Sequence, residues 1–222
     1  MKQNNIYVIG VTGGVGSGKS LALEYLFEKY GCILLKADDY GNEVKLKGNE
    51  CYKAIVELLG EEILDDNGEI IKSKMSDKIF GNDKLIAKVN SIIHPAVRKR
   101  IETEISKGKD KDIFVIEAAL LVEADYFDVL NELWEIKSEE ELRIKRLIYS
   151  RGYSLEKCRN IISSQHDTFY YMAADFAYRE KTSRKDYYGF KTILNNSSRE
   201  DLYRNIDRAM GEIYERFGQL RR

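Results

Sequence analysis

The chain has 222 residues, of which 43% are hydrophobic and 33% charged, as is typical of a globular protein with one large domain or a domain carrying an inserted lobe. Its formal net charge of -1 argues against a general binder of nucleic acids or membrane surfaces. The cysteines form no CxxC motif, residues 1–10 lack the apolar core of a signal peptide, and no stretch approaches the length of a membrane span. We therefore expect a cytoplasmic protein.

The N-terminal region predicts a strand, a phosphate loop and a helix, in that order. Residues 6–9 are an apolar run suited to a buried strand, and residues 13–20 read GGVGSGKS, which fits the pattern G-x-x-x-x-G-K-[ST]. Glycines permit positive φ, so backbone N–H groups can surround an anion, and a helix at 21–28 adds its dipole. Lys19 would reach the β- and γ-phosphates, and Ser20 would bind Mg²⁺. The predicted nucleotide-binding residues are Gly13, Gly14, Val15, Gly16, Ser17, Gly18, Lys19 and Ser20.

A second apolar run, at 32–35, is followed by the polar sequence Lys36-Ala37-Asp38-Asp39. In an open parallel sheet, ligands bind at the carboxyl ends of the strands. A carboxylate at that edge could take a proton from a substrate hydroxyl or hold a metal ion. The alternative is that Asp38 or Asp39 only caps the next helix.

The alternation of strand and helix stops between Tyr40 and about Ser106. Helical patterns at 50–60 and 84–107 predict a helical insertion on one side of the sheet. His94 precedes the only proline of the chain, and a residue before proline is displaced from the α region, so we expect His94 at a helix break. A single histidine of this kind is either functional or a satisfied structural residue.

Two more strands are expected, at 113–117 and 133–136. The first is apolar until its final residue, Glu117. An acidic strand end beside a phosphate loop helps to order Mg²⁺ and its water. Glu117 is therefore a candidate metal ligand, together with Ser20.

A helix at 139–150 carries Arg143, Lys145 and Arg146 and is followed by Arg151. Guanidinium groups on a lid downstream of a phosphate loop can neutralise charge on the transferred phosphoryl group. The alternative is that the helix presents an ordinary solvated, charged face.

The rest of the chain predicts helices, an exposed loop, a strand and a final helix. The loop is predicted because its polar sequence has neither helical nor strand periodicity. Ser198 and Asp201 have a spacing like that of a capping box, which predicts the start of the last helix. The expected segments are one or two helices at 154–174, the loop at 176–188, a strand at 190–194 and a helix to about 217.

Several motifs together resemble the dephospho-CoA kinase family, in the family's order and over residues 6 to about 200. The phosphate loop is shared with many kinases and NTPases, whereas the His-Pro segment and the acidic end of the third strand are more selective. The motifs are residues 10–20, Ala37-Asp38, Asn90-x-Ile92-Ile93-His94-Pro95-x-Val97, Glu117-Ala118-x-Leu120-Leu121-x-Glu123, Arg146-Leu147, Gln165 and residues 195–198.

The resemblance implies an α/β, three-layer P-loop NTPase fold with a parallel sheet of about five strands, a helical substrate-binding insertion and a helical lid. It implies transfer of the γ-phosphoryl group of ATP to the 3′-hydroxyl of dephospho-CoA with Mg²⁺, the last step of coenzyme A biosynthesis. The small-molecule partner would be dephospho-CoA. No nucleic-acid or membrane partner is expected, and the sequence does not determine the oligomeric state, for which a monomer is the default expectation. Asp38 matches the family's presumed base, Lys19 holds the nucleotide, and Arg146 and Arg151 match lid arginines. The implied substrate-binding residues are Asp38, His94, Glu117 and Leu120.

On this interpretation the chain, 1–222, is a single P-loop kinase unit made of several parts. The expected parts are a nucleotide-binding core at 1–39, 110–137 and 189–218, a CoA lobe at 40–109, a lid at 138–175 and the loop at 176–188.

The chain departs from the family pattern at a few positions, which leaves two alternatives open. Lys36 replaces an acidic residue, Ala119 replaces a proline, and Arg151 is shifted by one position. The usual basic residue after Gln165 is missing, and the segment between 176 and 195 is longer than usual. The alternatives are a P-loop kinase that acts on another acceptor, such as a nucleoside or nucleotide, and a non-catalytic homologue that binds a nucleotide or CoA.

Overall fold

The computed structural model describes residues 5–118 and 121–219. Of these, residues 5–35, 108–118 and 121–219 form one compact unit, and residues 36–107 form a second. The role predicted for 40–109, a lobe that binds CoA, stays a prediction.

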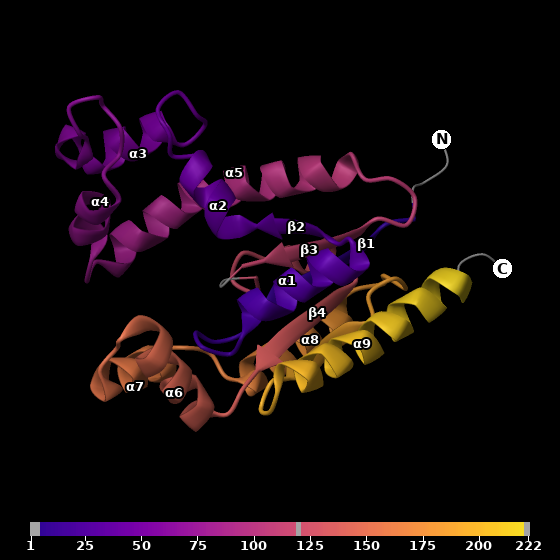
Figure 1. Cartoon of the computed structure of the whole chain (residues 1–222). Coiled ribbons are helices and arrows are strands. Elements are labelled where there is room, and N and C mark those ends of the chain that lie inside the picture. The colour runs from indigo at the N-terminus through magenta and orange to yellow at the C-terminus, as the bar shows by residue number, and fades with distance from the viewer. Residues whose placement is uncertain (1–4, 119–120, 220–222) are drawn as a thin grey trace. The chain divides into compact units, whose positions relative to one another are not determined.

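The first unit contains a five-stranded sheet with the strand order β2-β3-β1-β4-β5 (Figure 1). β1 pairs in parallel with β3 and β4, and β4 pairs in parallel with β5. All six residues of the central strand β1 are buried, which explains its uninterrupted apolar sequence. The parallel sheet predicted from the sequence is confirmed. The strands are β1 (Tyr7–Thr12), β2 (Ile33–Lys36), β3 (Ile113–Glu117), β4 (Glu132–Lys137) and β5 (Gly189–Leu194).

Two helices of the first unit, α1 (Lys19–Tyr30) and α9 (Arg199–Gln219), pack side by side against the sheet (Figure 1). Leu26 of α1 and Ile206 of α9 are fully buried together with Trp134 of β4. This core fixes the start of α1, and with it the end of the phosphate loop. The other helices of this unit are η2 (Tyr126–Asp128), α6 (Glu140–Arg151), α7 (Leu155–Ser163) and α8 (Thr168–Lys181).

The second unit is helical, and its longest helix corrects one prediction. α5 continues through Pro95, so the expectation that His94 lies at a helix break is wrong. The buried residues Val89 and Val97 anchor the helical turns before and after the proline, and this packing outweighs the hydrogen bond that proline cannot make. The helices of this unit are α2 (Ala37–Glu43), α3 (Tyr52–Leu59), η1 (Glu61–Ile63), α4 (Lys72–Ile79) and α5 (Asp83–Ser106).

The segment predicted as an exposed loop at 176–188 is also corrected. α8 extends to Lys181, so only residues 182–188 lie outside helix and strand. Arg179 Nε donates to Asp175 Oδ2 one helical turn earlier, at 3.0 Å. Tyr187 is buried and its hydroxyl donates to Asp175 Oδ1 at 2.6 Å. These contacts order a polar segment that has no periodic sequence signal.

The last helix begins with the reciprocal contacts of a capping box. Ser198 Oγ accepts a hydrogen bond from Asp201 N at 3.1 Å, and Ser198 N donates to Asp201 Oδ2 at 3.3 Å. The capping interaction predicted from their spacing is confirmed.

We expect Ser198→Ala to lower the free energy of unfolding by about 1 kcal/mol, because it removes the cap of α9. Urea unfolding followed by circular dichroism measures this change. Ser106→Ala, at the exposed end of α5, is the control and should be nearly neutral. Equal effects of the two substitutions would contradict a capping role.

The three cysteines are unpaired and buried, with exposed fractions of 1% for Cys32, 2% for Cys51 and 0% for Cys158. Burial raises the pKa of the Cys32 thiol to about 12 and also raises the pKa of Cys51. Because burial also shields all three sulfur atoms from a reagent, we expect the three thiols to react slowly with a disulfide reagent in the native protein and fast after denaturation. A native thiol that reacts as fast as in the denatured chain would contradict this burial.

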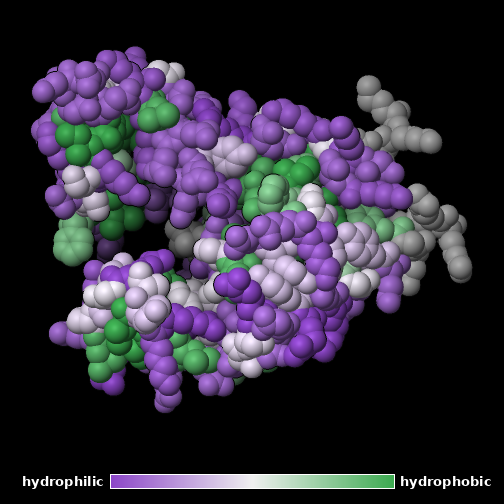
Figure 2. Space-filling model, in the orientation of Figure 1, coloured by the Kyte–Doolittle hydropathy of each residue, from purple (hydrophilic) through white to green (hydrophobic). Residues whose placement is uncertain are grey.

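The face of the molecule in Figure 2 is mainly hydrophilic, and one of several groups of hydrophobic residues lies over α6 and α7. In this segment Ile148 is 43% exposed and Leu155 is 45% exposed. Among the described residues, no helix combines the length and the apolar character needed to cross a membrane. The lid function predicted for 138–175 stays a prediction.

Candidate active site

The loop between β1 and α1 has a backbone shape that requires glycine. Gly13, Gly16 and Gly18 have φ values of 139°, 80° and 96°. A Cβ atom on Gly13 would lie 2.4 Å from Ile136 O, and one on Gly18 would lie 2.1 Å from Asn195 Nδ2. Gly13 and Gly18 therefore satisfy both a conformational and a steric requirement.

Lys19 and Ser20 form the first turn of α1. Their N–H groups have no acceptor within the helix, and the helix dipole places partial positive charge at this end. The Lys19 ammonium group crosses the loop and donates to Gly13 O at 2.6 Å. The Ser20 residue is exposed. Together these groups could hold phosphate oxygen atoms.

Arg146 of α6 contacts the same loop. Its Nη1 donates to Gly16 O at 3.3 Å and to Ser138 Oγ at 2.8 Å, and its Nη2 donates to Asn195 O at 3.1 Å. Burial lowers the pKa of the Arg146 guanidinium group. Arg146 therefore supports the loop and does not belong to a solvated face, while its action on the transferred phosphoryl group stays a prediction.

Two further side chains reach the loop and were not among the predicted site residues. Arg143 Nε donates to Val15 O at 2.9 Å, and Gln165 Oε1 accepts from Val15 N at 3.1 Å. The signal for Arg143 was its position three residues before Arg146, which places both on one side of a helix. The sequence identifies Gln165 only as a residue of a family motif and assigns it no role.

Arg151 lies elsewhere on α6. It lies five positions after Arg146, which turns it about 140° around the helix axis at about 100° per residue. Arg151 is exposed, and its guanidinium carbon lies 6.0 Å from the centre of the Tyr153 ring. The catalytic role predicted for Arg151 stays a prediction.

An acidic residue ends β3, at the edge of the sheet that bears the loop, and another follows it in the chain. The register pairs Glu117 with Val11 of β1, close to the start of the loop. Glu123 Oε1 lies 2.8 Å from His166 Nε2, and the His166 ring stacks on Tyr170 at 3.7 Å. The predicted residue Leu120, like Ala119 in the same motif, lies outside the described residues.

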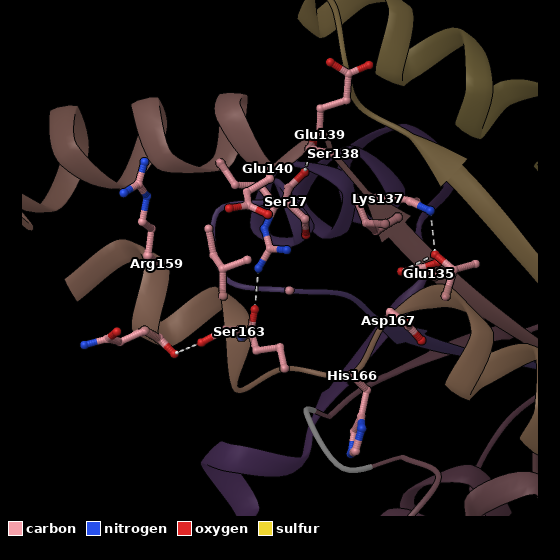
Figure 3. A pocket seen from close by; sticks show the side chains of 17 residues that line it. Ser17, Glu135, Lys137, Ser138, Glu139, Glu140, Arg159, Ser163, His166 and Asp167 are labelled. Atoms are coloured by element: carbon pink, nitrogen blue, oxygen red, sulfur yellow. Dashed lines mark hydrogen bonds between the residues drawn. The ribbon is translucent and has the colours of Figure 1, made fainter. Parts of the chain in front are cut away.

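A cavity of about 530 Å³ borders the loop between the β4–α6 turn and the α7–α8 turn. Within the described residues, two buried oxygen atoms of its lining residues, Ser17 Oγ and Glu135 Oε2, have no hydrogen-bond partner. Burial raises the pKa of Glu135. Unsatisfied oxygen atoms of this kind can receive water or a polar group. Figure 3 shows the lining, with Ser17, Ser138 and Glu140 on one side and Ser163, His166 and Asp167 on the other.

The predicted residues Asp38 and His94 belong to the second unit. Asp38 is exposed in the first turn of α2, and His94 is half-buried on α5. Lys45 and Lys72 line a cavity of about 140 Å³ in this unit. Burial, followed by repulsion from Lys72, lowers the pKa of Lys45, and the Asp38 charge opposes that shift. Glu69 also lines this cavity, so its two lysines and one carboxylate carry a net charge of +1, which can favour an anionic group.

The sequence matches the family model described as dephospho-CoA kinase over residues 7–178. A dephospho-CoA kinase from Streptococcus mutans is 35% identical over 159 residues, which cover 71% of this chain and 80% of the relative. A dephospho-CoA kinase from Idiomarina loihiensis is 30% identical over 211 residues, which cover 95% of each chain.

Two solved structures show the same fold. A crystal structure from Thermus thermophilus has a TM-score of 0.70 and 21% identity, covering 94% of this chain and 98% of that one. A dephospho-CoA kinase from Campylobacter jejuni has a TM-score of 0.55 and 21% identity, covering 94% of this chain and 97% of that one.

Proposed function

Because the chain belongs to the dephospho-CoA kinase family, we propose that it transfers the γ-phosphoryl group of ATP to the 3′-hydroxyl of dephospho-CoA. The 3′-oxygen atom would form a bond to the γ-phosphorus atom, and the bond from that phosphorus to the β–γ bridging oxygen would break. The products would be CoA and ADP. The observation that carries this proposal is the family match, which spans the phosphate loop and the helices that contact it.

The loop supports the ATP half of the proposal. Lys19 and the amides at the start of α1 supply positive charge where the β- and γ-phosphates of a bound nucleotide would lie. Phosphoryl transfer depends mainly on positioning and on neutralising charge, which this arrangement can provide.

The second unit supports the acceptor half. Asp38 carries an exposed carboxylate, which is available to take the proton of the 3′-hydroxyl group. We assign the cavity lined by Lys45 and Lys72 to an anionic part of dephospho-CoA. His94 is proposed to contact the acceptor from α5, as the family resemblance implies.

Ser20 and Glu117 would hold Mg²⁺ together with phosphate oxygen atoms of ATP. Both offer the oxygen ligands that Mg²⁺ prefers, and the register places Glu117 beside the strand that leads into the loop. When bound, the ion supplies positive charge to the β- and γ-phosphates.

We expect Glu117→Gln to raise the Mg²⁺ concentration needed for half-maximal turnover by about tenfold, since it weakens the binding of the ion or its water shell. Turnover measured over a Mg²⁺ series gives this value. Unchanged Mg²⁺ dependence would remove Glu117 from the metal site.

A monomeric cytoplasmic enzyme is the simplest setting for this activity, with dephospho-CoA as its small-molecule partner. The buried, unpaired cysteines agree with a reducing compartment.

ADP release measured by a coupled assay, with and without dephospho-CoA, tests the proposal. We expect ADP to form at an appreciable rate only when dephospho-CoA is present. A nucleoside or nucleotide that replaces dephospho-CoA with higher kcat/KM would identify another acceptor. Nucleotide binding without ADP release would identify a non-catalytic homologue.

A further inference from the structure

We propose that Arg143 and Gln165, here called the Arg143–Gln165 pair, are positioning residues that hold the crest of the phosphate loop in the shape that binds a nucleotide. This inference rests on the proposed function of the loop. It goes beyond that function because it assigns control of the loop to two side chains from the α6–α8 segment.

The pair satisfies both backbone groups of a single loop residue. Arg143 Nε donates to Val15 O at 2.9 Å, and Val15 N donates to Gln165 Oε1 at 3.1 Å. Arg143 Nη2 also donates to Gln165 Oε1, which joins the two side chains to each other. The peptide groups on both sides of Val15 are therefore fixed by contacts from outside the loop.

Arg143 is suited to this position for electrostatic reasons as well. The Arg143 side chain is half-buried, and this partial loss of water around the cation lowers the pKa of its guanidinium group. A partly desolvated guanidinium group gains more from a carbonyl acceptor than a solvated one does. Arginine also donates to Val15 O and Gln165 in a fixed fork, which lysine cannot reproduce.

The Arg143–Gln165 pair also explains why residue 14 is glycine, although the backbone conformation at this position does not require one. Gly14 does not have a positive φ, in contrast to Gly13, Gly16 and Gly18. A Cβ atom at position 14 would lie 2.2 Å from Arg143 Nη2 and 2.7 Å from Gln165 Oε1. Glycine at this position gives the Arg143–Gln165 pair room to reach the loop.

Fixing Val15 matters for binding because it limits the conformations of the unliganded loop. The apparent affinity of a site falls in proportion to the fraction of molecules that hold the binding-competent shape. Loss of the pair would reduce that fraction, so nucleotide binding should weaken although no group that we assign to the phosphates is removed.

The test compares the affinity for ADP, measured by calorimetry, in Arg143→Met, Gln165→Met and Gln165→Glu. We expect the Kd for ADP to rise about tenfold in Arg143→Met and in Gln165→Met, because each loses a hydrogen bond to Val15. Gln165→Glu should stay close to wild type, since its carboxylate can still accept from Val15 N and pair with Arg143. The KM for dephospho-CoA should not change in any of them. Lys145→Ala, an exposed cation on the same helix, is the matched control.

Gly14→Ala provides an independent test. Its Cβ should displace the pair and raise the Kd for ADP by about the same factor, and Gly14→Ala combined with Arg143→Met should be no worse than either single variant. Unchanged ADP affinity in Arg143→Met and Gln165→Met would overturn the proposal, even if kcat falls in these variants. Additive losses in the double variant would also overturn it. A wild-type protein that does not bind ADP would instead contradict the proposed function itself.

Discussion

Replacement of Lys19 by alanine is expected to lower kcat by about 10²–10³-fold, the range seen when one preorganised donor to a developing charge is removed. Lys19 begins α1, and its ammonium group reaches across the loop to Gly13 O at 2.6 Å. A bound nucleotide would offer phosphate oxygen atoms to the same ammonium group, and no other residue of the loop sequence carries a positive charge.

The fold should survive this substitution, because the helix that Lys19 begins is anchored by buried residues such as Leu26. Steady-state kinetics give the change in kcat, and urea unfolding shows whether stability is retained. Lys145→Ala serves as the control for the loss of one positive charge. Near wild-type turnover in Lys19→Ala would mean that the loop does not act on the transferred group.

Replacement of Asp38 by asparagine is expected to lower kcat by about 10²–10⁴-fold, the usual contribution of a general base. Asparagine keeps the size and polarity of the side chain but cannot take the proton of the acceptor hydroxyl. The affinity for ADP should stay unchanged, since the loop that would bind it is not altered.

Asp39→Asn is the matched control for Asp38→Asn, because the two aspartates are adjacent, exposed and in the first turn of α2. We expect Asp39→Asn to retain most of the activity. If both variants lose the same fraction of turnover, the aspartates act only on the helix or on the local charge, and Asp38 is not the base.

The phosphate loop and the strands could be predicted from the sequence because their determinants are local. The apolar run that ends at Glu117 coincides with β3, and the glycine pattern at 13–20 covers the loop between β1 and α1 and the first two residues of α1. Three of those glycines have the positive φ that the pattern implies.

The support of the loop could not be predicted in the same way, because it depends on contacts between distant parts of the chain. Arg143 and Val15 are 128 residues apart, and Gln165 and Val15 are 150 residues apart. A charged helix gives the same sequence pattern whether its arginines face solvent or a buried loop.

The two wrong predictions of secondary structure have the same origin. Pro95 predicts a break that packing around Val89 and Val97 overrides. The polar sequence that starts at Arg179 predicts a loop, but Arg179 pairs with Asp175 within α8, and Asp175 also accepts a hydrogen bond from Tyr187. In both cases contacts made in the folded chain outweigh the preference expected from the sequence.

The most direct test of phosphoryl transfer to dephospho-CoA is ³¹P NMR of the purified protein incubated with ATP, Mg²⁺ and dephospho-CoA. We predict that the γ-phosphate signal of ATP is replaced by signals of ADP and of a 3′-phosphomonoester on the ribose of CoA, and that neither forms with Lys19→Ala on the same time scale. Loss of the γ-phosphate signal to inorganic phosphate alone, or no change in the presence of dephospho-CoA, would contradict transfer to that hydroxyl group.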